Sequence, residues 1–464
     1  MKRTLRRSTL ILILTIAFIG GIGFFTAELL FNAGDWVDQP YNAHISGSGG
    51  LEKAGSILDR DGNPLAQSVD GERVYSDDET VRRALLHTVG DNSLNISTAV
   101  QSKYRSLLTG YSLIWGLNMP QSMRTSRDIV LTVDAETCKS AYSMLQTGFE
   151  EPKRGACVIY NYKTGDVICS VSTPGYDPAD PPQINEENEA YYDGVYLDNV
   201  LSSTFTPGSI FKIVTAAAAI ENIPDIYQRT WYCDGRETIG KNDIHCYQDT
   251  AHGEINLQEA MEHSCNIVFA QLAVELGSEK MNAMAEKMGV NMSFEIDDVF
   301  TAKGHYLAPA NDENVLGWTG VGQGSGEYED KVNPMQMAII CSAVANQGTA
   351  VNPTYIKGGN GDVLKEIGIK QNKTYDFLDP NTAKQVGDIM PVYEIGGLTV
   401  HAKTGTAEVG DEKGPNAWFV GYVADSDLPL AFACVVEDAG LGSEYARPVA
   451  EAALETAARL RGTL

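Results

Sequence analysis

The stretch Ser209-Ile210-Phe211-Lys212 is the one place in this chain where a serine stands three residues before a lysine. It opens the apolar run 213–220, IVTAAAAI, which predicts a buried helix, and a proline and a glycine stand just before it. Because three residues are nearly one helical turn, the Ser209 hydroxyl and the Lys212 amine should share one face. A buried amine loses its charge and can then accept the serine proton. The competing interpretation is a capping serine followed by a lysine that reaches solvent.

Two further short motifs follow along the chain. Ser264-Cys265-Asn266 comes after a predicted helical stretch at 256–261, and Lys403-Thr404-Gly405-Thr406 ends a predicted strand near the C-terminus. Each motif alone is weak, because Asn266 could simply cap a helix and Lys403 could be a solvated strand end. The two threonines could likewise be ordinary β-branched strand residues. The chain also carries two matching tripeptides earlier, Ser93-Leu94-Asn95 and Lys163-Thr164-Gly165.

The order of the motifs separates the meaningful set from the two earlier matches. S-x-x-K, then S-x-N, then K-T-G-T on a late strand is the order found in the serine acyltransferases that react with penicillin. From about residue 50 to its end, the chain resembles the class B penicillin-binding proteins, in a short form similar to penicillin-binding protein A. Other stretches that resemble the family in order are 56–66, 155–178, 206–209, 322–324 and 333–338.

This resemblance implies a role for each motif residue. Ser209 would attack a peptide carbonyl, and Lys212 would take its proton. Lys403 would supply a second cation that keeps Lys212 neutral, and it would attract the substrate carboxylate. Ser264 would relay a proton to the leaving amine, while Asn266 would orient Lys212 and the substrate amide. The expected substrate-binding residues are Thr404, Gly405 and Thr406, and the backbone N–H groups of Ser209 and Thr406 would form the oxyanion hole.

The activity that the resemblance implies is that of a D,D-transpeptidase. Such an enzyme cross-links peptidoglycan stem peptides ending in D-Ala-D-Ala and is inhibited by β-lactams. Three alternatives stay open: a β-lactamase or β-lactam sensor of the same fold, a D,D-carboxypeptidase, and a scaffold that activates a membrane glycosyltransferase. The partner in the last case would be of the SEDS type (shape, elongation, division and sporulation). No glutamate motif for rapid hydrolysis of an acyl-enzyme is visible in the sequence.

Length and charge narrow the class of protein. The 464 residues predict two or three domains, and the formal net charge of −26 argues against nucleic acid or an anionic membrane surface as a ligand. The N-terminus is an exception, because Lys2, Arg3, Arg6 and Arg7 precede an uncharged stretch from about 8 to 27. That stretch is long enough to cross a membrane.

The charges beside this stretch predict its orientation. Basic residues before it, and Asp35 and Asp38 after it, indicate a cytoplasmic N-terminus and an extracytoplasmic remainder. The alternative is a cleaved signal peptide, but the apolar stretch is long and no clear small-residue cleavage site follows Phe25. We therefore expect an uncleaved single-pass membrane anchor.

The eight cysteines would lie outside the membrane on this topology, where disulfides can form. Cys233 and Cys246 flank a polar, turn-rich segment and are the expected disulfide pair. A metal site with His245 and His252 is an alternative, but the spacing matches no familiar zinc motif, so no metal and no cofactor is predicted. In an anaerobic organism even this pair could be free thiols. Packing as small apolar residues is expected for Cys157, Cys169, Cys265, Cys341 and Cys434.

The alternation of residues predicts an α+β fold. An early hairpin at 155–160 and 166–172 and three late strands near 398–403, 417–423 and 430–437 should form a five-stranded antiparallel sheet flanked by helices. This is the serine transpeptidase or β-lactamase-like fold that the resemblance implies. The expected divisions are a cytoplasmic tail at 1–8, a transmembrane helix at 9–31, a linker and small β-rich pedestal at 32–150, and a transpeptidase domain at 151–464.

Overall fold

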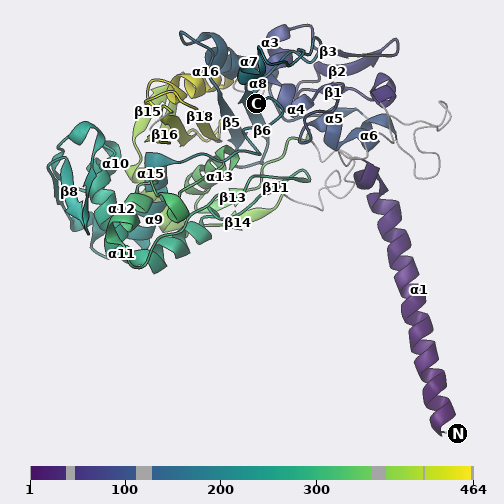
Figure 1. The fold of residues 1–464 in the computed structure, drawn as a ribbon, viewed down its shortest axis with the longest axis horizontal. Helices are drawn as coiled ribbons and strands as arrows, with labels where there is room; N and C mark the ends of the chain where they lie inside the picture. Colours follow the sequence, from purple (N-terminus) through teal and green to yellow (C-terminus); the bar gives the residue numbers. More distant parts are fainter. Residues whose placement is uncertain (1, 38–47, 111–127, 358–371, 411–412, 461–464) are drawn as a thin grey trace.

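An antiparallel sheet at the centre of the fold joins strands from distant parts of the sequence (Figure 1). An early hairpin pairs with strands from the end of the chain, as the sequence predicts. The strand order is β15-β16-β17-β18-β5-β6. Their bounds are Val392–Ile395 for β15, Leu398–Ala407 for β16, Asn416–Val423 for β17, Leu430–Val436 for β18, Gly155–Asn161 for β5 and Val167–Thr173 for β6.

The prediction of five strands was wrong by one, because the sheet has six. The sixth, β15, pairs with the first residues of β16 through a turn at Gly396 and Gly397. Both glycines have positive φ, which is typical of a tight hairpin. A strand of four residues with an exposed Val392 gives little apolar signal.

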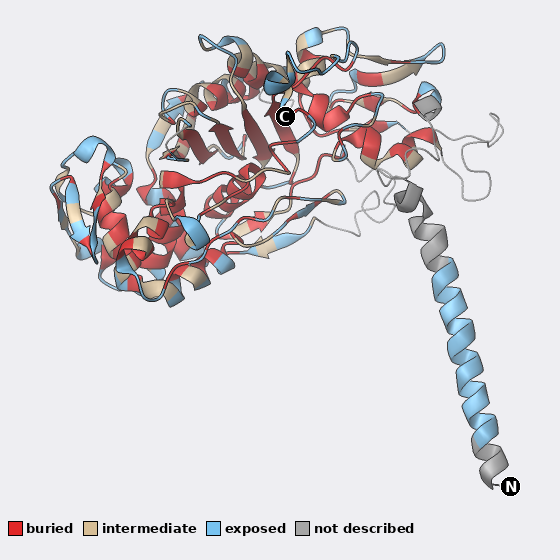
Figure 2. Cartoon of the chain, in the orientation of Figure 1, coloured by how far each residue is buried: buried red, intermediate tan, exposed pale blue. Residues whose placement is uncertain are grey.

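Helices cover both faces of the sheet. Helix α13 (Pro334–Ala345) packs on one face, and α7 (Ala135–Thr147) and α16 (Ala446–Arg459) pack on the other (Figure 1). Every residue of β17 and β18 is therefore buried, which explains their continuous apolar sequences (Figure 2). The structure describes residues 2–37, 48–110, 128–357, 372–410 and 413–460.

A second, mostly helical region lies beside the β15–β16 edge (Figure 1). It contains α9 (Lys212–Asn222), α10 (Leu257–Glu262), α11 (Asn266–Lys287), α12 (Glu313–Gly320) and α15 (Pro380–Ile389). The same region also contains several short strands. These are Trp231–Cys233 (β7), Arg236–Ile239 (β8), Asn242–His245 (β9), Gly253–Ile255 (β10), Glu295–Ile296 (β11) and Val299–Phe300 (β12).

The N-terminal lobe contains a small sheet of its own, in the order β3-β2-β1-β4. Residues 56–66, one of the stretches that resemble the family, contain the antiparallel pairing of β1 with β2. The strands are Ile57–Leu58 (β1), Pro64–Val69 (β2), Glu72–Tyr75 (β3) and Ile129–Val130 (β4), and the helices are Glu79–Ala84 (α3), Leu86–Val89 (α4), Val100–Lys103 (α5) and Arg105–Thr109 (α6).

The apolar core runs without interruption from this lobe into the central sheet. Leu51, Ile57 and Leu65 belong to the same buried cluster as Val158 and Phe432. The division of the extracytoplasmic part at residue 150 stays a prediction, since packing does not mark a boundary there. Part of the predicted linker, residues 38–47, lies outside the described residues.

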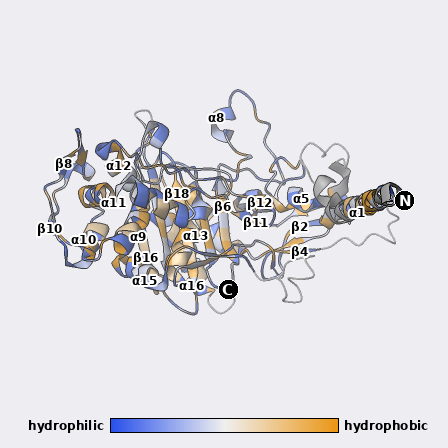
Figure 3. Ribbon diagram, turned by 90° about the horizontal axis from the view of Figure 1, so that it is seen from below, coloured by the Kyte–Doolittle hydropathy of each residue, from blue (hydrophilic) through white to orange (hydrophobic). Residues whose placement is uncertain are grey.

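Helix α1 (Lys2–Val37) projects from the rest of the chain, with one end beside α6 (Figure 1). Its segment Arg7–Thr26 has a mean hydropathy of 2.3 and none of it is buried within the protein. The apolar colouring of this helix is visible in Figure 3. A helix of this length and composition can cross a membrane, which agrees with the expected anchor.

Candidate active site

Ser209 lies at the start of the buried helix that the sequence predicts. It belongs to a 3₁₀ turn, Gly208–Phe211, that leads directly into α9. Gly208 has φ of +55°, and a Cβ there would lie 2.8 Å from the carbonyl oxygen of Thr406 on β16. Glycine is therefore required where the turn comes closest to the sheet. This close approach places the half-buried Ser209 hydroxyl beside the strand that carries the K-T-G-T motif.

Lys212 is fully buried one turn after Ser209, and its amine lies at the centre of a hydrogen-bonded group. Its Nζ donates to Ser209 Oγ at 3.0 Å, to Ser264 Oγ at 3.1 Å and to Asn266 Oδ1 at 2.7 Å. A fourth contact, at 2.7 Å, goes to the backbone oxygen of Ser264. Burial lowers the pKa of Lys212 to about 7. The alternative of a lysine that reaches solvent is wrong.

Ser264 occupies a left-handed turn between two helices. Helix α10 begins with a capping box formed by Asn256 and Glu259, and it ends just before Ser264. Ser264 then has φ of +55°, which is uncommon for a residue other than glycine. The turn directs its hydroxyl between two amines, because Lys403 Nζ also donates to Ser264 Oγ, at 2.9 Å.

Asn266 is the first residue of α11, and it does not cap that helix. The cap position is Cys265, which makes no side-chain capping bond. The Asn266 amide accepts from Lys212 and donates its Nδ2 hydrogen to the His245 carbonyl at 2.8 Å. It therefore ties α9 to the strand β9.

Lys403 is buried in the middle of β16, with 1% of its surface exposed. Strand β16 runs through Ala407 and so ends just after the motif, as the sequence predicts, whereas the alternative of Lys403 as a solvated strand end is wrong. Burial lowers the pKa of Lys403 well below its usual value, and repulsion by Lys212 lowers it further. Two buried amines that share the Ser264 hydroxyl cannot both hold a proton easily.

The backbone of β16 offers hydrogen-bond donors towards the nucleophile. The N–H of Ala402 donates to Pro391 on the β15 side, and N–H groups two residues apart on a strand point the same way. The N–H of Thr406 therefore points to this edge as well, beyond the point where β15 ends. The carbonyl of Thr406 faces Gly208 on this same edge. This direction is consistent with the predicted oxyanion hole.

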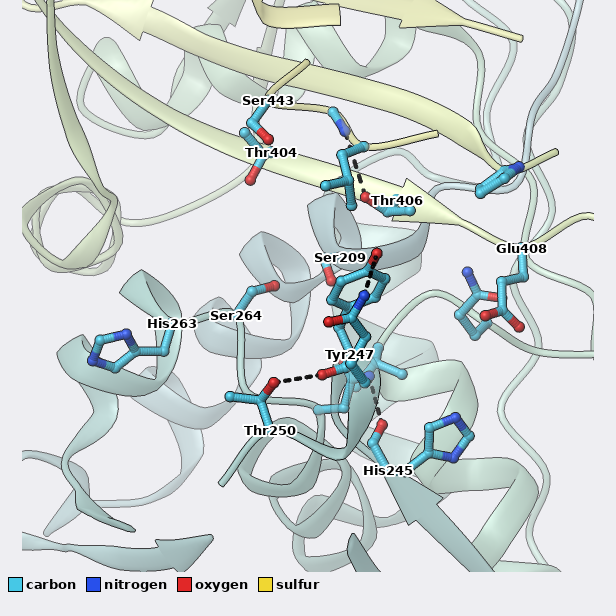
Figure 4. A pocket seen from close by; sticks show the side chains of 18 of the residues that line it. Ser209, His245, Tyr247, Thr250, His263, Ser264, Thr404, Thr406, Glu408 and Ser443 are labelled. Atoms are coloured by element: carbon cyan, nitrogen blue, oxygen red, sulfur yellow. Dashed lines mark hydrogen bonds between the residues drawn. The ribbon is translucent and has the colours of Figure 1, made fainter. Parts of the chain in front are cut away.

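A cleft of about 780 Å³ opens between β16 and the helical region. In Figure 4, Ser209 and Ser264 lie on its helical side, and Thr404 and Thr406 lie on the strand opposite them. Gly405 contributes to the same wall. His245 and His252, which the sequence offered only as alternative metal ligands, also line the cleft. Lining residues that the sequence did not single out are Tyr247, Gln248, Thr250, His263, Trp318, Val321, Ser325, Glu408, Pro415, Leu441, Gly442 and Ser443.

The structure thus brings together every residue predicted for the site, and the two earlier matches lie elsewhere. Lys163 sits in the exposed turn of the β5–β6 hairpin, where its amine contacts Asn346 Oδ1 at 2.6 Å. A residue that the sequence did not indicate is Asp330, a buried carboxylate that accepts from the Gly324 N–H at 2.7 Å. It fixes the turn beside Gln323, which lines the cleft.

The expected disulfide is not present. The sulfur atoms of Cys233 and Cys246 are 3.7 Å apart, and all eight cysteines are free. The expectation that Cys265 merely packs in an apolar core was incomplete. Its sulfur also lies 3.7 Å from that of Cys246.

Comparison with known proteins agrees with this geometry. The family model "Penicillin binding protein transpeptidase domain" matches residues 155–455, which include all three motifs. The chain belongs to the penicillin-binding protein transpeptidase family. Peptidoglycan D,D-transpeptidase PbpA of Mycolicibacterium smegmatis is 27% identical over 364 residues, covering 71% of this chain and 72% of the relative. Stage V sporulation protein D of Bacillus subtilis is 26% identical over 343 residues, covering 70% and 50%.

Solved structures of penicillin-binding proteins have the same fold. The crystal structure of penicillin-binding protein A from Mycobacterium tuberculosis superposes with a TM-score of 0.73 at 25% identity, covering 87% of this chain and 99% of that one. The D,D-transpeptidase domain of a peptidoglycan glycosyltransferase from Eggerthella lenta gives 0.71 at 25% identity, covering 89% and 99%. These likenesses confirm the resemblance to class B penicillin-binding proteins of the penicillin-binding protein A type.

Proposed function

We propose that this penicillin-binding protein is a peptidoglycan D,D-transpeptidase that works through an acyl-enzyme on Ser209. The observation that carries the proposal is the 3.0 Å contact between the Ser209 hydroxyl and a buried lysine amine whose pKa is lowered to about 7. A neutral amine at that distance is a competent general base. Relatives named as D,D-transpeptidases, and solved acyl-enzymes of M. tuberculosis penicillin-binding protein A with ceftriaxone and imipenem, support the same activity.

Acylation begins when Lys212 removes the Ser209 proton. The Ser209 oxygen attacks the carbonyl carbon of the penultimate D-Ala and forms a new C–O bond. The backbone N–H groups of Ser209 and Thr406 stabilise the oxyanion. The C–N bond to the terminal D-Ala then breaks, and the leaving amine takes a proton through the Ser264 hydroxyl, which contacts Lys212. An amine of a second stem peptide attacks the ester and regenerates the Ser209 hydroxyl.

The pairing of Lys212 with Lys403 would allow a bound substrate to activate Lys212 as the general base. In the free protein burial lowers the pKa values of both amines, and repulsion by Lys212 lowers the pKa of Lys403 further. A substrate carboxylate bound beside Thr404 and Thr406 would favour the ammonium form of Lys403. That charge would in turn drive Lys212 to the neutral form, in which it can accept the serine proton. Binding and activation of the nucleophile would thus be linked through the Ser264 hydroxyl.

Labelled penicillin tests the proposal directly. The full-length protein in detergent should form a stable adduct, located by mass spectrometry on the peptide that contains Ser209. Ser209→Ala should form none, while its melting temperature stays close to that of the wild type. Lys403→Ala should slow acylation. Lys163→Ala is the matched control, because Lys163 begins a second Lys-Thr-Gly sequence on an exposed turn, and it should leave the rate of acylation unchanged. An undiminished adduct in Ser209→Ala would refute the assignment.

The β-lactamase alternative differs in the lifetime of the adduct. Among the described residues that line the cleft, Glu408 is the single carboxylate. If it activated water, the adduct would decay rapidly and Glu408→Gln would prolong it. If the protein is a transpeptidase, the adduct should last for minutes to hours in both the wild type and Glu408→Gln. The same assay, with a D-Ala-D-Ala peptide and no acceptor amine, measures carboxypeptidase activity.

We also propose that α1 anchors the protein with its N-terminus in the cytoplasm, as the basic residues before Arg7–Thr26 favour. The N-terminal lobe would then lie near the membrane, where a SEDS-type glycosyltransferase could contact it. Because this lobe shares its core with the central sheet, deleting it would disturb the whole fold. A surface change such as Val69→Glu, at a residue that is 44% exposed, is the better test. Loss of growth with this variant but not with Ser209→Ala would make the scaffold role the main one.

A further inference from the structure

Four potential metal ligands meet beside the S-x-N motif. They are the sulfur atoms of Cys233, Cys246 and Cys265 and the Nδ1 atom of His252, and all lie within 4.8 Å of one another. The three cysteines are buried and the histidine is half-buried. We propose that these residues form a structural zinc site that fixes the S-x-N motif of the active site. The proposal is independent of the activity, because metal content can be measured whether or not Ser209 is acylated.

The distances fit a tetrahedral zinc ion. Zn–S bonds of 2.3 Å place two sulfur ligands about 3.8 Å apart, and a Zn–N bond of 2.0–2.1 Å places sulfur and nitrogen about 3.6 Å apart. Cys246 Sγ lies 3.7 Å from the sulfur atoms of both Cys233 and Cys265. His252 Nδ1 lies 3.4 Å from Cys233 Sγ and 3.7 Å from Cys246 Sγ.

The backbone holds the four residues together from separate elements. Cys233 ends β7 and pairs with Gly253 on β10, and the N–H of His252 donates to the Cys233 carbonyl at 3.1 Å. Cys246 follows β9, and its N–H donates to the carbonyl of Gly235 at 2.9 Å. The fourth ligand, Cys265, directly precedes helix α11. The strands of this region are only three or four residues long, and a metal ion would cross-link them to the start of α11.

A disulfide explains the cluster less well than a metal ion. Cys246 is equally distant from two other sulfur atoms, so either bond would leave the third thiol and the histidine nitrogen unused. Apolar packing does not explain why an imidazole nitrogen is directed at two sulfur atoms. Three soft sulfur ligands and one imidazole are the ligand types that select zinc over magnesium or calcium. Four protein ligands leave no open coordination position, which is typical of a structural site.

The site would act on catalysis through Cys265. This residue stands between Ser264 and Asn266, both of which contact the Lys212 amine. On binding, the three thiols would release their protons to solvent, and the thiolates would coordinate the ion. Fixing the Cys265 sulfur would hold the left-handed turn at Ser264 in place. The four ligands are thus positioning residues, and they take no part in the reaction.

The test is the metal content of the full-length protein, purified in detergent without added metal and measured by mass spectrometry. Wild type should contain about one zinc per chain, and Cys246→Ser and His252→Gln should each contain less than about a tenth of that. Cys341→Ser, at a buried cysteine of α13, should keep its zinc. His263→Gln should keep it as well, because that ring stacks on His252 but is not among the four ligands.

Two further measurements distinguish the loss of a metal ligand from misfolding of a variant. Cobalt added to the metal-free wild type should give a thiolate charge-transfer band and the visible bands of a tetrahedral site, and His252→Gln should alter both. Removal of zinc by a chelator should slow acylation by penicillin about tenfold or more, and zinc should restore the rate. Four results would each overturn the proposal. They are wild type that contains no metal, Cys246→Ser that retains its zinc, a metal other than zinc in the site, and the loss of two of the eight thiols to a disulfide.

Discussion

At the scale of single residues, the site depends on the buried amine of Lys212. Its four close contacts keep it in one place, and burial rather than any single charge lowers its pKa to about 7. Below that pH the amine holds a proton and cannot accept another. Above it the amine has a free electron pair.

The rate of acylation by penicillin should therefore rise with pH and level off above about pH 7, falling about tenfold per pH unit on the acid side. Stopped-flow fluorescence with a labelled penicillin measures this rate. In Lys212→Met the residual rate should lose this dependence. A wild-type rate that is flat, or that falls as the pH rises, would contradict the role of Lys212 as the base.

Ser264 offers a second prediction at this scale, because its φ of +55° costs a non-glycine residue about 1–2 kcal/mol. Ser264→Ala should retain this strain, whereas Ser264→Gly should relieve it. Both lose the hydroxyl between the two amines, so both should acylate about 10²–10³ times more slowly than wild type. Urea unfolding should show the glycine variant to be the more stable by about 1 kcal/mol. Equal stability of the two variants would show that the turn is not strained.

At the scale of elements, two helices begin with the same capping box in different surroundings. Asn256 at the start of α10 is half-buried and bonds only within its own box. Asn333 at the start of α13 is fully buried, and its amide also donates to the carbonyls of Leu201 and Ser203 at 3.1 and 2.8 Å.

Asn256→Ala should reduce the free energy of unfolding by about 1 kcal/mol, the usual cost of a lost cap. Asn333→Ala should reduce it by roughly 3 kcal/mol, because two buried carbonyls lose their donor. Urea denaturation followed by circular dichroism compares the two. If both variants lose the same amount, the extra hydrogen bonds of Asn333 contribute nothing.

The elements also show what a sequence can and cannot predict. The long apolar strands β17 and β18 and the helix α9 were predictable, because burial on both sides leaves continuous apolar runs. The three motifs were found through their order. Strand β15 was missed because four residues at an edge carry little pattern. The sequence offered a metal site of Cys233 and Cys246 with His245 and His252 only as an alternative, and it did not link Cys265 to them, because these residues meet only after β7, β9 and β10 have folded.

At the scale of the whole molecule, the N-terminal lobe is joined to the transpeptidase part by an ion pair as well as by the core. Arg82 of α3 holds Asp177, in the loop after β6, through two hydrogen bonds of 2.8 and 2.6 Å. The Arg82 side chain is 17% exposed and that of Asp177 is 8% exposed. Its neighbour Arg83 pairs instead with Glu79, whose side chain is 61% exposed.

Arg82→Ala should lower the free energy of unfolding by roughly 1–3 kcal/mol at neutral pH, and Arg83→Ala by less than about 1 kcal/mol. The hydrogen bond from Arg82 lowers the pKa of Asp177, so the contribution is present above the unfolded value and is lost as the pH falls below about 4. The two variants should therefore converge in acid. Thermal unfolding across this pH range measures the difference, and a gap that persists in acid would contradict the explanation.

The uninterrupted core has a consequence for how defects reach the active site. Since Leu51 and Phe432 belong to one cluster, the lobe and the sheet should melt together, in one calorimetric transition. A destabilising substitution in the lobe would then reduce the number of folded molecules, while the turnover rate of each folded molecule would stay unchanged. A cell carrying such an allele would resemble one that makes too little of the protein, and raised expression would rescue it.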